Sequence, residues 1–397
     1  MVRQAEGEEF LQTYLRNISN NYKCAVGLVL GQIVAQKFTI IHLARTPSTQ
    51  NEDITVKGSN NCVTDLDQNW IADHAKQTTR MLPGGVHVLG IFIVSDEDIF
   101  NPFNTKIKSI LNEINKILLL EIFLSGSNDN EKLVLHYSPK YQKCSTKSYD
   151  VNTFSVQPVD LKFVPKGNKL VNFECTYIID QIYYFKKNDA AGPLRKHIKV
   201  ILDEINRDLK SAIVLFDNDI KNEDEKLENV GKKKKASRGS SNKIAHETSD
   251  TNKPVSVTIL KNNFMPYAEK QLKLIETGGQ IKIIGEVISR IWLNSKSTWG
   301  NAVQAVKDDI MRSLISRMEM HWDSLTEEEL GEDVNSVHEP PRRVYIILPE
   351  SDVTISDYLF PGEGAEDIKT SLDELLDIQL RDDLEVLDLE GQAGTGV

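Results

Sequence analysis

The stretch RMLPGGVHVLGIFIVS, residues 80–95, decides how the first half of the chain folds. Pro83, Gly84 and Gly85 are poor helix formers in succession, so any helix that precedes them ends here. Val86–Val94 is a nearly continuous apolar run, which is typical of a strand that is covered on both faces. The stretch therefore predicts a helix, a turn and a central buried strand, in that order.

The segments on either side of this strand complete a first domain of mixed α/β type. Before it, Asp65 or Asp67 is placed to cap a helix that runs to about Arg80. After it, apolar residues recur at helical spacing from Ile107 to Leu118. Four further apolar runs predict strands: Cys24–Leu30, Phe38–Leu43, Leu133–Tyr137 and Ser145–Val151. We predict that this domain covers residues 1–155.

The second half contains the clearest strand pattern of the chain. In Asn172–Phe185 every second residue is apolar over most of the run, which predicts a strand with one buried face. Strands are also predicted at Val255–Leu260 and Ile281–Leu293, with a helix after each long strand. The prediction is a second, α+β domain over residues 156–390.

One segment within this second domain has a different composition. Residues 217–253 combine mixed charges, four consecutive lysines and a Ser-rich stretch with only isolated apolar residues. Such a segment buries too little surface to offset its ordering entropy. We predict a disordered insertion there, and a flexible tail at residues 391–397.

Charge is distributed unevenly over the 397 residues, whose net charge is −11. Residues 321–397 hold 21 Asp and Glu but only 4 Lys and Arg. A region this acidic repels nucleic acid and anionic lipid, so neither is expected as a partner. No apolar run approaches the ~18–20 residues that a membrane span needs. The four cysteines stand far apart, which predicts a reduced, cytosolic chain.

The sequence contains no motif for phosphate binding or for nucleophilic catalysis. None of the eight histidines is two, three or four residues from another, so the spacings of zinc sites do not occur. His42, His87 and His136 lie in apolar strands, where a hydrogen-bonded core histidine is more common than a metal ligand. No cofactor and no metal are predicted.

The order of elements in the first domain resembles the MPN fold. VGLVLG, FTIIHLARTP, the helix ending at TRML and the strand VHVLGIFIVS carry this likeness. In MPN metalloproteases the strand ends in Gly, two large residues and a zinc-binding His-x-His pair. Aligned on Gly90, the two ligand positions fall on Ile93 and Ser95, with Asp96 and Asp98 nearby. Isoleucine has no lone pair for zinc and serine is a poor ligand, so the resemblance implies an inactive site.

A closer resemblance, to the odorant-response-abnormal protein 4 family, covers nearly the whole chain. It is carried by RMLPGGVHVLGIFIVS, NAVQAVKDDI, SRGSSN and RVYIILPESDVTISDYLFPGEGAEDI. The resemblance implies a non-enzymatic adaptor at the cytosolic face of the endoplasmic reticulum membrane. It also implies heterodimer formation with the ubiquitin-fold-modifier-specific cysteine protease, and a role in folding and trafficking of odorant-type G-protein-coupled receptors.

The sequence departs from the pattern of this family at one place, the C-terminus. The family has a hydrophobic membrane segment there, and this sequence ends at Val397 without one. We therefore expect this chain alone to be soluble and to reach a membrane only through such an anchor.

Two alternatives stay open: a hydrolase of ubiquitin-like conjugates, and a receptor-trafficking factor that works without the protease. An adaptor also needs a docking surface. Two stretches are weak candidates, although ordinary turn or core packing is the more common role for each: the turn Leu82, Pro83, Gly84 and Gly85, and the helix positions Val303 and Val306.

Overall fold

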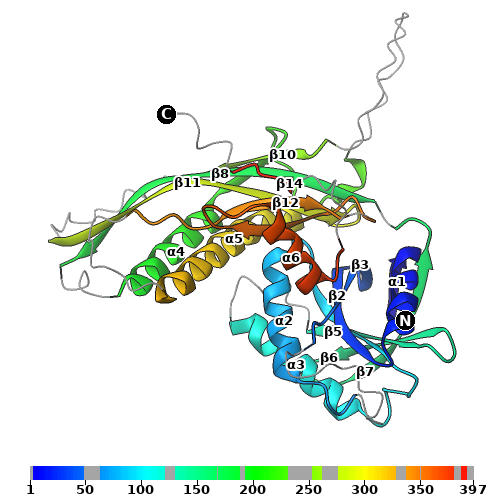
Figure 1. Cartoon of the computed structure of the whole chain (residues 1–397). Coiled ribbons are helices and arrows are strands. Elements are labelled where there is room, and N and C mark those ends of the chain that lie inside the picture. Colours follow the sequence, from blue (N-terminus) through cyan, green and yellow to red (C-terminus); the bar gives the residue numbers. More distant parts are fainter. Residues whose placement is uncertain are drawn as a thin grey trace, which may run out of the picture.

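The computed structural model describes residues 3–48, 63–120, 130–167, 169–187, 193–230, 253–261, 276–327, 337–348, 350–379 and 386–390. Its elements form a closed barrel, a four-stranded sheet and a three-stranded sheet, with helices packed against each (Figure 1). This mixture confirms the predicted α+β class. None of the described helices is both long and apolar enough to cross a membrane.

The barrel is built from the first seven strands, in the order β1-β3-β2-β4-β5-β6-β7. Parallel pairing of β1 with β7 closes it, and the predicted central strand is β4, between β2 and β5. The strand bounds are β1 Arg3–Glu8, β2 Ala25–Val34, β3 Lys37–Arg45, β4 His87–Val94, β5 Glu131–Ser138, β6 Lys143–Asp150 and β7 Val156–Val164.

Three helices cover the barrel strands: α1 Glu9–Asn21, α2 Gln68–Met81 and α3 Asn104–Leu120. Leu11, Leu15 and Ile18 of α1 are buried against one face of the strands, while α2 and α3 pack on the other. Asp67 caps α2, because its carboxylate accepts hydrogen bonds from the amides of Asn69 and Trp70. The sequence allowed either Asp65 or Asp67 as the cap of this helix, and the structure shows that Asp67 is the cap.

The second sheet has the order β11-β8-β10-β9, with β8 Leu170–Lys186, β9 Ile213–Phe216, β10 Val255–Leu260 and β11 Thr277–Asn294. The helices α4 Leu194–Ser211 and α5 Trp299–Glu327 lie beneath the long strands β8 and β11 (Figure 1). Phe173, Cys175, Tyr177 and Ile179 of β8 are buried on the helix side, as the alternation predicts. On the opposite face, Thr176, Ile178 and Asp180 of β8 are exposed.

The third sheet joins the barrel to the second sheet. It has the order β13-β12-β14, with β12 Arg342–Ile347, β13 Thr354–Leu359 and the short β14 Val386–Leu387. Its helix α6, Ala365–Leu376, packs on α2, β3 and β13. Ring nitrogens of His42 and His74 lie 2.9 Å and 2.8 Å from the carbonyl oxygens of Leu376 and Leu375. The barrel thus provides donors for the unpaired carbonyls at the end of α6.

Three details differ from the expectations. The boundary expected at residue 155 falls before β7, whose pairing with β1 and β6 extends the barrel to Val164. The structure describes residues 217–230 of the predicted insertion. Within them, Glu225 and Leu227 form backbone hydrogen bonds with Trp299 and Ser297 at the start of α5. Residues 231–252 and the tail 391–397 lie outside the described residues.

The third difference concerns the cysteines. We expected all four to be reduced, but Cys24 is disulfide-bonded. Cys144 and Cys175 are free thiols.

Candidate functional site

The two positions that align with zinc ligands in MPN proteases lie at the end of β4. Ile93 is fully buried and packs with the helices that cover the barrel. Ser95 is 4% exposed, and its Oγ lies 3.2 Å from Nε2 of His136 and 3.1 Å from the carbonyl oxygen of Glu97. Neither side chain is free to coordinate a metal ion.

The two carboxylates nearby have local structural roles. Asp96 accepts a hydrogen bond from the amide of Lys140 at 3.0 Å. Asp98 accepts one from the amide of Phe100 at 3.0 Å and one from the side chain of Asn101 at 3.2 Å. Across the described ranges, no three His, Cys, Asp or Glu side chains gather closely enough to hold a metal ion.

Ser95 and His136 form a pair whose atoms are those of a serine nucleophile and its base. In such enzymes a carboxylate orients the histidine, and the serine is open to substrate. Here Nδ1 of His136 faces the hydroxyl of Ser145 at 3.5 Å, and Ser95 is buried. Burial also lowers the pKa of His136. The arrangement is that of a hydrogen-bonded core histidine, as expected for His136.

The two free thiols are poorly suited to nucleophilic chemistry. Burial raises the pKa of Cys144 to about 12 and that of Cys175 to about 12. Since the thiolate is the reactive form, both are protonated and unreactive near neutral pH.

The docking candidates taken from the sequence lie inside the molecule. Leu82, Pro83, Gly84 and Gly85 are all buried, and the amide of Gly84 donates to the carbonyl of Arg290 in β11 at 3.3 Å. Val306 is 1% exposed and Val303 packs beside it on the core of the second sheet. Leu82, Pro83, Gly84, Gly85 and Val306 thus contact other parts of this chain, whereas Val303 is partly exposed.

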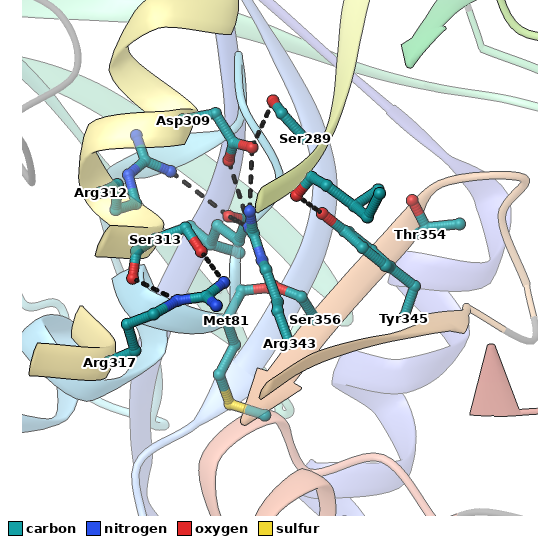
Figure 2. Close-up of polar contacts among 12 residues, drawn as sticks. Met81, Ser289, Asp309, Arg312, Ser313, Arg317, Arg343, Tyr345, Thr354 and Ser356 are labelled. Carbon is teal, nitrogen blue, oxygen red and sulfur yellow. Dashed lines mark hydrogen bonds and ion pairs between the residues drawn. The ribbon is translucent and has the colours of Figure 1, made fainter. Parts of the chain in front are cut away.

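The turn contacts a cluster of buried charges that the sequence did not bring to attention. We call Asp309, Arg312, Arg343, Ser289 and Ser356 the buried charge junction (Figure 2). Arg343 and Asp309 are fully buried and form a two-point ion pair, with N–O distances of 2.9 Å and 3.2 Å. Ser289 donates to the same carboxylate at 2.7 Å.

The junction connects all three parts of the fold. Asp309 and Arg312 come from α5, Ser289 from β11, and Arg343 and Ser356 from β12 and β13. Both guanidinium groups also donate to the carbonyl oxygen of Leu82 at the end of α2, at 3.3 Å and 3.4 Å. Figure 2 shows these side chains converging between the elements. Burial alone would lower the pKa of Arg343, but Asp309 and nearby tyrosines raise it above its ordinary value.

Helical spacing could have pointed to part of this cluster. Asp309 lies three residues after Val306 and one before Ile310, which places a carboxylate beside the buried stripe of α5. A charge at such a position needs a buried partner. The sequence could not reveal that the partner is Arg343, because 34 residues separate the two.

His87 yields a prediction about acid stability. Its Nδ1 is buried with no hydrogen-bond partner among the described residues, and burial together with Arg312 and Lys132 lowers its pKa to about 3. Below pH 6.5 the imidazole of His87 binds a proton in the unfolded chain but stays neutral in the folded chain. The free energy of unfolding therefore falls as the pH falls.

We expect the free energy of unfolding of the wild type to fall by about 2 kcal/mol more than that of His87→Phe between pH 7 and pH 5. Urea unfolding at the two pH values measures this difference. Asp357, whose pKa burial raises to about 6, acts in the opposite direction but equally in both proteins. Equal losses in the two proteins would show that His87 is not held neutral.

Comparisons with known proteins agree on one family. The sequence profile described as "Odorant response abnormal 4-like" matches residues 27–385. "Protein odr-4 homolog" of Homo sapiens is 29% identical over 390 residues, covering 96% of this chain and 84% of the relative. The Mus musculus homolog is 30% identical over 388 residues, with the same coverage of both chains. "Odorant response abnormal protein 4" of Caenorhabditis elegans is 24% identical over 332 residues, covering 79% of this chain and 64% of the relative.

The crystal structure of UfSP from C. elegans matches with a TM-score of 0.48 and 9% identity, over 96% of this chain and 58% of that one. The likeness of the first domain to the MPN fold stays a prediction.

Proposed function

This chain belongs to the Odorant response abnormal 4-like family, and on that premise we propose that it is a non-catalytic adaptor. In this proposal it binds the ubiquitin-fold-modifier-specific cysteine protease as a heterodimer and holds it at the cytosolic face of the endoplasmic reticulum. The pair would serve the folding and trafficking of odorant-type G-protein-coupled receptors. The match over residues 27–385 is the observation on which the proposal rests.

The side chains at the position of the lost zinc site support a role without catalysis. Ile93 is part of the apolar core, and the hydroxyl of Ser95 is hydrogen-bonded within the chain. The two free thiols have raised pKa values. The chemistry in this proposal therefore belongs to the partner.

Exposed apolar side chains support a binding role. Ile178 and Tyr184 of β8 and Ile284 of β11 are 60%, 64% and 67% exposed on the face of the second sheet that points away from α4 and α5. Ile178 and Ile284 occupy diagonal positions in the β8–β11 pairing, so their side chains are neighbours on one face. Large apolar side chains that gather on a surface are typical of interaction sites.

Affinity capture from cells tests the proposal. We expect the tagged chain, extended by a membrane anchor, to recover the protease in equimolar amount and to shift it into the endoplasmic reticulum fraction. The Ser95→Ala variant should recover as much protease as the wild type, because Ser95 has no catalytic part. Absence of the protease from the capture would contradict the adaptor proposal.

Two further measurements separate the alternatives. Labelling of the isolated chain by a modifier-based electrophilic probe, or stoichiometric zinc by elemental analysis, would favour a hydrolase. Recovery of receptors without the protease would favour a trafficking factor that acts alone. We expect no labelling, no zinc, and receptors only together with the protease.

A further inference from the structure

A five-residue segment near the C-terminus, Val386–Glu390, lies on the edge of β12. It pairs antiparallel to β12, with Val386 opposite Ile346 and Leu387 opposite Tyr345. The other edge of β12 is occupied by β13. The segment thus adds a strand to a sheet edge, which is a common way for one protein to bind an extended peptide of another.

Two acidic side chains of the segment meet basic partners. Asp388 accepts a hydrogen bond from Nε of Arg342 at 2.8 Å, in a pair about one third exposed. Glu390 is deeper, with its side chain only 5% exposed. Both residues follow β14, whose strand pairing ends at Leu387.

The carboxylate of Glu390 receives donors from three different elements. One oxygen accepts from the amide of Ile288 in β11 and from the guanidinium of Arg317 in α5, both at 3.0 Å. The other accepts from the amide of Arg343 in β12 at 2.8 Å. Arg317 is itself positioned by the hydroxyl of Ser313 at 2.8 Å. Three converging donors, one of them charged, form a site with the geometry and charge for a carboxylate.

Apart from the carboxylate of Glu390, the segment makes few contacts. Only two of its residues pair with β12, and the ion pair of Asp388, about one third exposed, contributes at most ~1 kcal/mol. Being tethered to the same chain raises its effective concentration to the order of millimolar, which keeps the site filled despite a weak contact. A segment of the same chemistry on another protein can therefore compete for the site.

We propose that the β12 edge, with Arg342, Arg317 and the amides of Ile288 and Arg343, is a docking site for an extended acidic segment of a partner protein. The segment recognised has two apolar residues followed by Asp-x-Glu, and residues 386–390 of this chain occupy the site in its absence. The inference adds a binding site to the proposed adaptor function, but its test needs neither the protease nor the membrane.

Binding of a fluorescent peptide to the full chain tests the proposal, read by fluorescence polarisation. The probe has the sequence EVLDLEG of residues 385–391. We expect the double variant Asp388→Ala/Glu390→Ala to bind it at least ~10-fold more tightly than the wild type, because the competing segment is weakened. A probe with lysine in place of its Asp and second Glu should not bind.

Two matched variants control the result. Asp373→Ala/Glu374→Ala removes two exposed acidic residues from α6, away from the site, and should bind the probe like the wild type. Adding Arg342→Glu to the Asp388→Ala/Glu390→Ala variant should weaken probe binding about 10-fold, because the pair with the aspartate becomes repulsive. Arg342 is partly exposed, so this change leaves the core intact.

Hydrogen exchange gives an independent measurement. The amides of Ile288 and Arg343 should exchange faster in Asp388→Ala/Glu390→Ala and regain protection when the probe is added. Equal probe affinity in wild type and variant, binding that ignores the probe's carboxylates, or no restored protection would each overturn the proposal. The segment would then be an ordinary strand of the fold.

Discussion

Asp309→Asn is expected to lower the free energy of unfolding by about 3–5 kcal/mol, among the largest effects of any single substitution in this chain. The amide keeps the shape of the side chain but removes the carboxylate that pairs with Arg343. That guanidinium is fully buried, and an uncompensated buried charge is far more costly than a broken surface pair. Denaturant unfolding followed by circular dichroism measures the change.

A second substitution distinguishes loss of the pair from loss of packing. Asp309→Leu combined with Arg343→Met removes both charges and should recover most of the stability, since buried ion pairs are often replaceable by apolar side chains. Glu113→Gln breaks an exposed pair with Lys116 and should cost less than ~1 kcal/mol. If Asp309→Asn costs no more than Glu113→Gln, the junction does not hold the three parts of the fold together.

Gly84→Ala is expected to lower the free energy of unfolding by about 3 kcal/mol. A Cβ atom at this position would lie 2.2 Å from Cγ2 of Ile291, 2.9 Å from Cβ of Asp309 and 3.0 Å from the carbonyl oxygen of Ala305. These atoms belong to β11 and α5, so the added methyl group separates the α2–β4 turn from the second sheet. Thermal and denaturant unfolding both report the loss.

The clash can be tested by removing its other partner. Ile291→Ala creates space next to Gly84, so the double variant should lose less stability than the sum of the two single losses. Gly364→Ala serves as the control, because no atom lies within 4 Å of its added Cβ. Additive losses in the double variant would show that the close approach of Gly84 to Ile291 is not the cause.

The secondary structure could be predicted from local pattern to a large extent. The alternation in Asn172–Phe185 gave the buried face of β8, and β10 was predicted with the bounds that the structure has. The helix with Ile107, Ile110, Leu111 and Ile114 on its buried stripe is α3.

The candidate sites were predicted less well, for a physical reason. A buried turn and an exposed turn have the same local sequence requirements, so the sequence left docking open at Leu82–Gly85 beside the more common role of internal packing. The structure shows that β11 covers it. The acidic composition of residues 321–397 does not reveal that Glu390 is buried and bound by three donors from distant elements.

The sequence by itself determined the type and approximate order of the elements, and the family. These follow from side-chain period and identity, which are local properties. Only the tertiary structure decided that β7 closes the barrel, that Asp309 pairs with Arg343, and that residues 386–390 occupy the β12 edge. Those contacts join residues far apart in the chain, and the free energy that selects them comes from burial and charge pairing that exist only once the elements have packed.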